Sequence, residues 1–184
     1  MANSPVKLLE NGLPNINRYI TTTDSSGKSI LSNDIPSTSI WQKIGSIANF
    51  FLGYTTRTFP VPLSSANDIS SYNKDLSSPP GLTVSNGTVL RYVDMAPDSI
   101  SPMHKTASLD YGIVLEGEIE LVLDSGETQL MRRGDICVQR GTNHAWRNVT
   151  PNSGWGRMVY VLVAAQGEGL MEDLNGMPDV KGSD

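Results

Sequence analysis

The sequence predicts an all-β fold, either a sandwich or a barrel. After Gly81, short apolar runs and turn residues alternate about every 8 to 12 positions, which is the strand spacing of such folds. Within Glu118–Leu123 apolar and polar residues alternate, as in a half-buried antiparallel strand. No helical pattern longer than two turns is expected before the C-terminal tail. At 184 residues the chain can bury one core, so a single domain is predicted.

The predicted strands follow one another closely after Gly81. Turn residues such as Gly, Asp, Asn and Pro separate them. In chain order the strands are Thr88–Met95, Tyr111–Leu115, Ile119–Leu123, Thr128–Met131, Ile136–Gln139, His144–Asn148 and Met158–Ala164.

Changes of composition divide the chain into four segments. Residues 1–62 comprise an N-terminal extended arm up to about residue 40 and then the aromatic run Trp41–Pro62, which is expected to pack on the barrel as a strand and a turn. Residues 63–81 are polar, and Ser64–Gly81 is predicted to be a mobile loop that forms the pocket rim or a lid. Residues 82–166 form the barrel core, and 167–184 are a polar tail.

Composition and charge exclude several classes of partner. The net charge of −5 argues against nucleic acid, whose backbone is bound by clustered Lys and Arg. A single cysteine, Cys137 in an apolar run, excludes an intramolecular disulfide and fits a reducing compartment. Since neither a signal-peptide pattern nor a membrane-length apolar run occurs, we expect a soluble, cytoplasmic protein with no membrane partner.

The chain has only two histidines, and both lie in strand-like surroundings. His104 precedes Asp110 in SPMHKTASLDYG, and His144 lies in QRGTNHAWRN. Because side chains alternate along a strand, His144 and Trp146 share one face of theirs. If both strands line the barrel interior, His144 and Asp110 converge there, and His104 arrives from the residues just before.

These motifs resemble those of the cupin superfamily, a small double-stranded β-helix or jelly-roll barrel. The spacing from His104 through Asp110 to Gly117 matches its first motif, with Thr106 at the second His and Asp110 at the Glu. The second motif matches the residues from Gly134-Asp135 through His144 to Asn148. In place of the motif's usual proline turn, this sequence has Arg140 and a turn that is one residue shorter.

The resemblance covers Leu82 to Ala165. The patterns HxTxxxDYG and QRGTNHAWxN are similar to those of single-domain bacterial and fungal cupins, and several fungal members are associated with small-polyketide biosynthesis. The resemblance therefore implies a small oxygenated polyketide or aromatic substrate.

Two histidines are too few for the three-His, one-Glu metal site that the cupin family implies. His104, Asp110 and His144 remain as a two-His-one-carboxylate ligand set, which suits Fe(II) and leaves positions open for substrate or O2. One divalent metal (Fe, Mn, Zn or Ni) is thus a candidate cofactor. A metal-free site stays open as well, because Asp is one methylene shorter than Glu and Thr106 is a poor ligand.

Three further residues are candidates for substrate binding. Thr106 can donate or accept a hydrogen bond. Trp146 is either the aromatic wall of a ligand pocket or barrel packing. Arg91, inside an apolar run, either binds a substrate carboxylate or enolate bidentately or pairs with Asp94 or another acid on the outside.

Three functions fit these residues. In the favoured one, a lyase or isomerase uses His104, His144 and Asp110 to remove a proton beside a carbonyl, in dehydration, decarboxylation or aromatising cyclisation. The second is a non-haem iron oxygenase or other oxidoreductase, and the third is a non-catalytic small-molecule-binding cupin. The first is favoured because it does not require a metal, whereas the second does.

We expect a homodimer, since cupin barrels like this one often pair sheet to sheet and the aromatic segment Trp41–Phe59 offers surface that one small barrel does not cover. Light scattering at micromolar concentration should give twice the 19.9 kDa monomer mass. A monomer mass would contradict the expectation.

Overall fold

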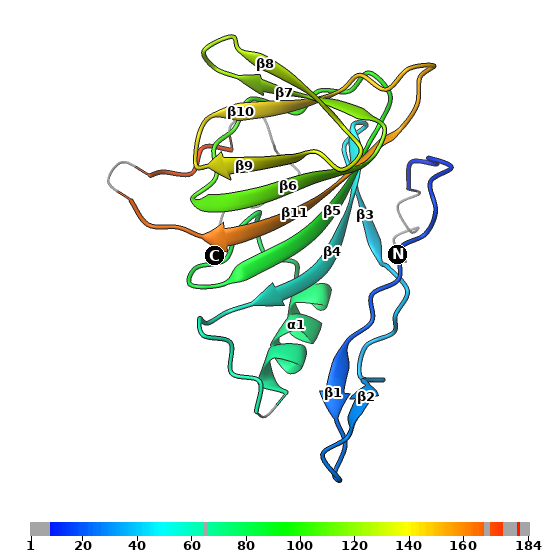
Figure 1. Cartoon of the computed structure of the whole chain (residues 1–184), viewed down its shortest axis with the longest axis vertical. Helices are drawn as coiled ribbons and strands as arrows, with labels where there is room; N and C mark the ends of the chain where they lie inside the picture. The colour runs from blue at the N-terminus through cyan, green and yellow to red at the C-terminus, as the bar shows by residue number, and fades with distance from the viewer. Residues whose placement is uncertain (1–7, 65, 168–169, 175–179, 181–184) are drawn as a thin grey trace, which may run out of the picture.

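The computed structural model describes residues 8–64, 66–167, 170–174 and 180. A six-stranded sheet in the order β3-β4-β5-β11-β6-β9 and a three-stranded sheet in the order β10-β7-β8 enclose one interior as a jelly-roll barrel (Figure 1). The all-β prediction is therefore confirmed. The bounds are β1 Thr21–Thr23, β2 Ser29–Leu31, β3 Trp41–Ile44, β4 Ala48–Thr56, α1 Asn67–Ser77, β5 Thr88–Met95, β6 Ser108–Glu116, β7 Glu118–Leu123, β8 Thr128–Arg132, β9 Ile136–Arg140, β10 His144–Asn148 and β11 Gly156–Ala164.

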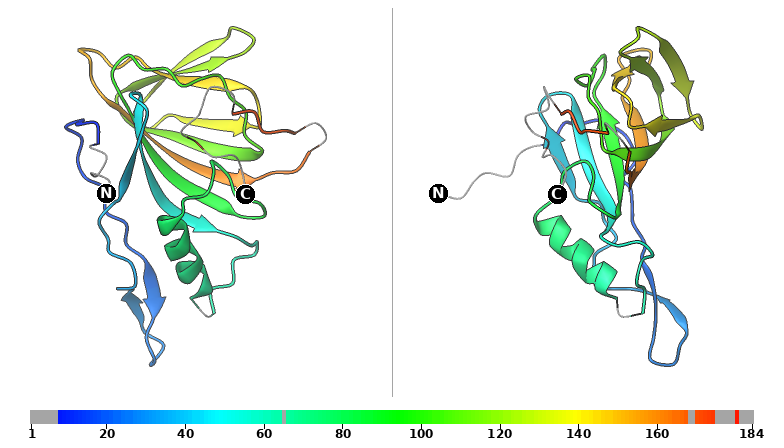
Figure 2. Two further views of the ribbon diagram at one scale, coloured as in Figure 1. Left: turned by 180° about the vertical axis from the view of Figure 1, so that it is seen from behind. Right: turned by 90° about the vertical axis from the view of Figure 1, so that its left-hand side faces the viewer.

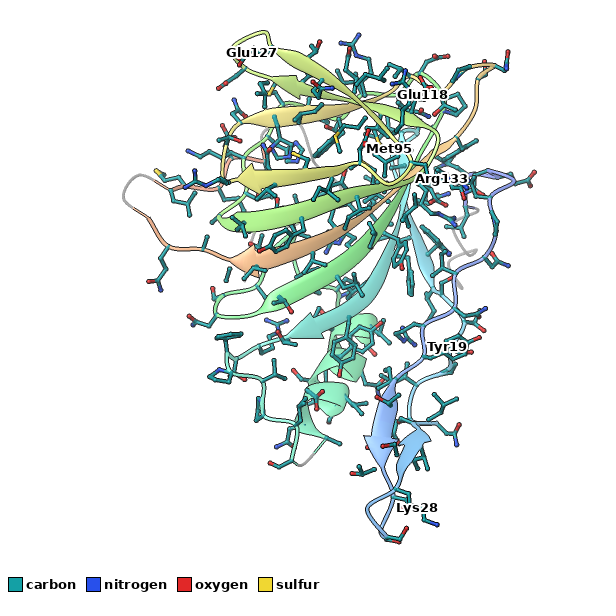
Figure 3. All side chains as sticks on the ribbon, in the orientation of Figure 1. Tyr19, Lys28, Met95, Glu118, Glu127 and Arg133 are labelled. Carbon is teal, nitrogen blue, oxygen red and sulfur yellow. The ribbon has the colours of Figure 1, made fainter. Side chains whose placement is uncertain are left out.

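Apolar side chains from both sheets fill the space between them. The interior cluster consists of Met95, labelled in Figure 3, with Val114, Ile119, Met131, Trp146 and Met158. Strand β6 shows why a period of two selects the inward side chains, because Ser108, Asp110, Gly112 and Val114 are buried along one face. Gly112 lies under the ring of Tyr160, and a Cβ there would come within 3.1 Å of that ring.

A segment before β6 adds an irregular edge to the smaller sheet. Residues 99–105 run antiparallel to β10, and isolated bridges join Ile100 to Arg147 and His104 to His144. The His104 amide donates to the carbonyl of His144 at 2.8 Å, and the His144 amide donates back at 2.9 Å. The two histidines are thus directly opposite each other, forty residues apart in the chain.

Asn148, at the end of the second motif, joins the end of β5 to the loop between β10 and β11. Its Nδ2 donates to the carbonyls of Met95, Ala96 and Gly154 at 2.9 to 3.1 Å. Its Oδ1 accepts from the amide and the hydroxyl of Thr150 at 3.0 and 2.6 Å. This buried amide side chain is structural, because its hydrogen bonds join the end of β5 to the β10–β11 loop at one end of the barrel.

The N-terminal segment contains the predicted arm and the predicted strands. Figures 1 and 2 show the β1–β2 hairpin extending away from the barrel, beside α1 and opposite β7–β8. The aromatic run forms β3 and β4, and its Phe51 packs between Trp41 and Tyr92. Only Phe59, 83% exposed, offers a large bare ring in this run, so most of the surface invoked for a dimer is already covered within the chain. The homodimer itself stays a prediction.

The predicted loop Ser64–Gly81 instead contains helix α1, an eleven-residue helix. Ile69 and Tyr72 are buried against β4, and the hydroxyl of Tyr72 donates to the carbonyl of Leu52 at 2.7 Å. The sequence signal was a sparse apolar spacing of three and four in NDISSYNKDLS, which tertiary contacts rather than intrinsic propensity stabilise. Within the described residues, no helix has both the length and the apolar character needed to cross a membrane.

Replacing Asn148 by Ala should destabilise the barrel by about 3 kcal/mol, since buried carbonyls and the Thr150 hydroxyl lose their partners. Urea unfolding followed by tryptophan fluorescence measures the loss. Arg147→Ala is the matched control, because the neighbouring side chain lies on the outer face of β10 and is 44% exposed. An equal effect of both substitutions would contradict the structural role assigned to Asn148.

Candidate active site

A cavity of about 300 Å³ lies between the two sheets. Its walls come from β5, β6, β10 and β11, from residues 99–106 and from the β3–β4 turn. All six residues predicted to bind or transform a substrate line this one cavity: Arg91, His104, Thr106, Asp110, His144 and Trp146. The convergence predicted for His104, Asp110 and His144 is therefore present in the structure, and Arg91, Thr106 and Trp146 share the same cavity.

The cavity also has lining residues that sequence reasoning missed. The turn Ile44–Ala48 forms part of its wall, whereas none of the described residues of Ser64–Gly81 does. Leu76, Pro79 and Pro80 instead line an adjoining pocket that shares Arg91 with this cavity, and the mobility predicted for the segment stays a prediction. The available signal was the apolar turn Ile44-Gly45-Ser46-Ile47, where Gly45 has a φ of 51°. Tyr160, placed opposite Gly112 on β6, was missed because β11 reads as an unbroken apolar strand.

The two histidine rings are in contact, with their planes tilted by 48°, and both are held in the same way. Each Nδ1 lies 2.9 Å from the carbonyl two residues earlier, Pro102 for His104 and Thr142 for His144. Because a carbonyl only accepts, each Nδ1 carries the proton and each Nε2 carries the lone pair. The ring centroids are 4.3 Å apart, and both histidines line the same cavity.

Both rings are neutral at neutral pH. Burial lowers the pKa of His104 below its usual 6.5. Burial, reinforced by the neighbouring His104, lowers the pKa of His144 to about 4. The pair can therefore accept a proton or bind an electrophile through Nε2.

Asp110 is a buried carboxyl group, 4% exposed, on β6. Burial raises its pKa to about 6, against the opposing effect of the Ser108 and Thr106 hydroxyls. The hydroxyl of Thr106 donates to Oδ2 at 3.1 Å, while Oδ1 has no hydrogen-bond partner among the described residues. Thr106 therefore serves the carboxylate, and its proton is not free for a substrate oxygen.

Trp146 combines the two roles considered for it. Its ring meets His144 and Tyr160 edge-on, with centroids 5.6 and 5.7 Å away, and it also lines the cavity. It is a packing residue of the interior cluster and a cavity wall at once.

Arg91 is buried in the cavity wall and does not pair with Asp94. Asp94 instead accepts from Nε and Nη2 of Arg157 at 2.5 and 2.7 Å. Burial lowers the pKa of Arg91 to about 10, which leaves it charged at neutral pH.

His104, His144 and Asp110 meet part of what a metal ion requires of its ligands. Imidazoles with Nδ1 held by carbonyls are typical metal ligands, and the unpartnered Oδ1 of Asp110 is a chemically suitable third. In the described residues, however, no three His, Cys, Asp or Glu side chains gather closely enough to hold an ion. The arrangement falls short of the three protein ligands of usual catalytic metal sites, so the predicted ligand set remains a prediction.

The sheet arrangement and the motif histidines together define a cupin barrel, and the comparisons agree. The family model for the cupin domain matches residues 91–154. Phomopsin biosynthesis cluster protein C' of Diaporthe leptostromiformis is 51% identical over 150 residues, which are 82% of this chain and 79% of the relative.

Two further relatives extend the comparison. Oryzines biosynthesis cluster protein J of Aspergillus oryzae is 39% identical over 86% of this chain and 88% of its own. The cupin-domain-containing oxidoreductase fogC of Aspergillus ruber is 45% identical over 83% of this chain and 74% of its own. This chain belongs to the cupin family and is similar to proteins of fungal biosynthesis clusters.

Asp110→Asn should stabilise the protein at pH 7.5 and leave its stability unchanged at pH 4. The folded state binds more protons than the unfolded state between pH 3.8 and about 6, so wild-type stability declines as the pH rises through that window. Above it, the ionised buried carboxylate costs about 3 kcal/mol, which an amide avoids. Urea unfolding of both proteins at the two pH values measures the difference.

Asp124→Asn, in the exposed turn after β7, is the control and should change stability at neither pH. A loss of stability for Asp110→Asn at pH 7.5 would show that the carboxylate has a favourable partner in the folded protein.

Proposed function

We propose that this protein is a small-molecule enzyme that moves a proton next to a carbonyl group, as a lyase or isomerase of secondary metabolism. The observation that carries the proposal is the convergence of three unprotonated bases, His104, His144 and Asp110, in one otherwise largely apolar cavity. Dehydration, decarboxylation and aromatising cyclisation share this proton transfer. The substrate is a polyketide-like or aromatic metabolite, a size that a cavity of about 300 Å³ admits.

The three groups have different base strengths. Asp110, with a pKa of about 6, accepts a proton at neutral pH and can return it to another carbon or to a departing oxygen. His144, with a pKa of about 4, is a weaker base than Asp110. The two Nε2 lone pairs accept hydrogen bonds from a substrate hydroxyl or from an enol form, which orients the substrate in the cavity.

The low polarity of the walls strengthens these effects. Val93, Met95 and Leu162 present apolar side chains to the cavity that contains the ionisable groups. A carboxylate without its full set of hydrogen bonds is a stronger base than one in water, which is why burial raises the pKa of Asp110. The buried carboxylate thus lowers the stability of the folded protein and is at the same time a stronger base.

An oxidoreductase is the second candidate, because several relatives carry that name, among them fogC of Aspergillus ruber and virC of Hypocrea virens. In that case the two imidazoles would hold a divalent metal together with Asp110, and the metal would supply O2 activation or electron transfer. A non-catalytic binding cupin is the third candidate.

Solvent isotope exchange tests the proposed proton transfer without knowledge of the natural product. In D2O, the wild-type protein should speed deuterium incorporation next to the carbonyl groups of 4-acetylbenzoate and benzoylacetone, followed by NMR. His104→Ala and Asp110→Asn should each slow the catalysed exchange by about 100-fold or more. The control Asp124→Asn, far from the cavity, should match the wild type.

Elemental analysis of protein purified without chelator or nickel resin separates the alternatives. Exchange that persists at the same rate in metal-free protein supports the lyase or isomerase. Stoichiometric iron that is lost in both His104→Ala and His144→Ala, with O2 uptake in place of exchange, would support the oxidoreductase. Unchanged exchange in all variants would reject the assigned site.

A further inference from the structure

We infer that Arg91 is an anion-binding residue and that the substrate carries a carboxylate at a distance from the carbon that reacts. The inference deepens the proposed function, on which the choice of a carbonyl compound as ligand rests. It is carried by a buried guanidinium in the cavity wall that, among the described residues, has one hydrogen bond and no carboxylate partner.

The surroundings of Arg91 leave most of its donors available to a ligand. Arg91 is 6% exposed, and its Nη2 donates to the carbonyl of Gly81 at 2.7 Å. One face of the guanidinium lies over the ring of Phe50, 5.4 Å from its centroid. A guanidinium has five N–H donors in a fixed fork that matches a carboxylate. The tether to Gly81 and the ring of Phe50 hold this fork in one orientation.

The other buried arginine shows how the same fold satisfies a structural guanidinium. Arg157 forms a bidentate pair with Asp94 and also donates to the carbonyl of Pro14 at 2.7 Å. Arg91 lies on the same strand as Asp94 yet receives no such carboxylate. Burying an unpaired charge is costly, so a fold that keeps one in a cavity wall gains from a ligand that pairs with it.

The outward-facing arginines make the same contrast. Arg132, Arg133 and Arg147 each pair with a glutamate on the barrel surface. These paired cations do not line the cavity. Arg91 therefore differs from the structural arginine inside the protein and from the paired arginines outside it.

The strand register separates the anion site from the acid–base groups. Arg91 on β5 is paired with Tyr160 on β11, and Tyr160 is paired in turn with Gly112 on β6. Asp110 lies two residues before Gly112 on the same strand. The Cα atoms of Arg91 and Asp110 are thus about 10 Å apart across the sheet and about 7 Å apart along it. Both side chains line one cavity. A bound carboxylate would place the far end of a small molecule among His104, His144 and Asp110.

Equilibrium binding tests the inference with two probes of the same shape. 4-Acetylbenzoate carries a ketone and a carboxylate at opposite ends, and 4′-methylacetophenone replaces the carboxylate by a methyl group. Wild-type protein should bind the acid at least about tenfold more tightly, the gain expected of one charge-assisted bidentate contact. Titration calorimetry or ligand-observed NMR at pH 7.5 measures both dissociation constants.

Two substitutions of Arg91 are compared with one control. Arg91→Met, which keeps the length and loses the charge, should remove the preference for the acid, and Arg91→Lys should retain part of it because a point charge replaces the fork. Arg147→Met, on the outer face of β10, should keep the wild-type preference. If Arg91→Met does not fold, the inference is tested by the preference of the wild-type protein for the acid and by the reduced preference expected of Arg91→Lys.

Equal affinity of the wild-type protein for the two probes, or an undiminished preference in the Arg91 variants, would overturn the inference. Because binding is measured without turnover, it is independent of the isotope-exchange test. If the preference for the acid depends on Arg91 but no deuterium exchange is catalysed, the anion site stands and the proposed function fails. If exchange is catalysed but the preference for the acid does not depend on Arg91, the proposed function stands and the anion site is rejected.

Discussion

The site depends on one antiparallel bridge, in which His104 and His144 exchange backbone hydrogen bonds at 2.8 and 2.9 Å. This pairing joins residues 99–105 to β10 and brings the chain's only two imidazoles within 4.3 Å of each other. Each Nδ1 is satisfied by the carbonyl two residues earlier, so the same local backbone arrangement fixes both tautomers. The bridge thereby determines which ring nitrogens are available for chemistry.

Burial then sets the charge state of what the bridge assembles. Burial disfavours charge, so it lowers the pKa values of both histidines and raises those of Asp110 and Tyr160. Arg91 is the exception, because a guanidinium remains protonated even when burial lowers its pKa to about 10. At neutral pH the cavity thus combines neutral imidazoles, a carboxylate of raised basicity and one fixed cation.

The second motif serves structure and chemistry through alternate residues of the same inward face. His144 and Trp146 line the cavity, whereas Asn148 binds the carbonyls of Met95, Ala96 and Gly154 and lies outside the cavity lining. The barrel closure and the cavity wall are therefore built from one short strand. Asn148 and His144 are both buried, yet one makes hydrogen bonds within the fold and the other lines the cavity.

The sequence by itself determined the all-β class, the strands after Gly81 and the convergence of His104, Asp110 and His144, because a period of two fixes which side chains face inward. Tertiary structure alone decided the rest. Helix α1 forms because Tyr72 and Ile69 find buried partners on β4, which a weak local pattern does not reveal. Arg91 and Asp94 are three residues apart on β5 and therefore face opposite sides of the sheet, where Asp94 pairs with Arg157. That no described carboxylate reaches Arg91 on the inner side is visible only in the tertiary structure. The spacing of residues along a strand determines which face of the sheet each side chain is on. The hydrogen-bond partners and the burial of that side chain depend on residues far away in the chain.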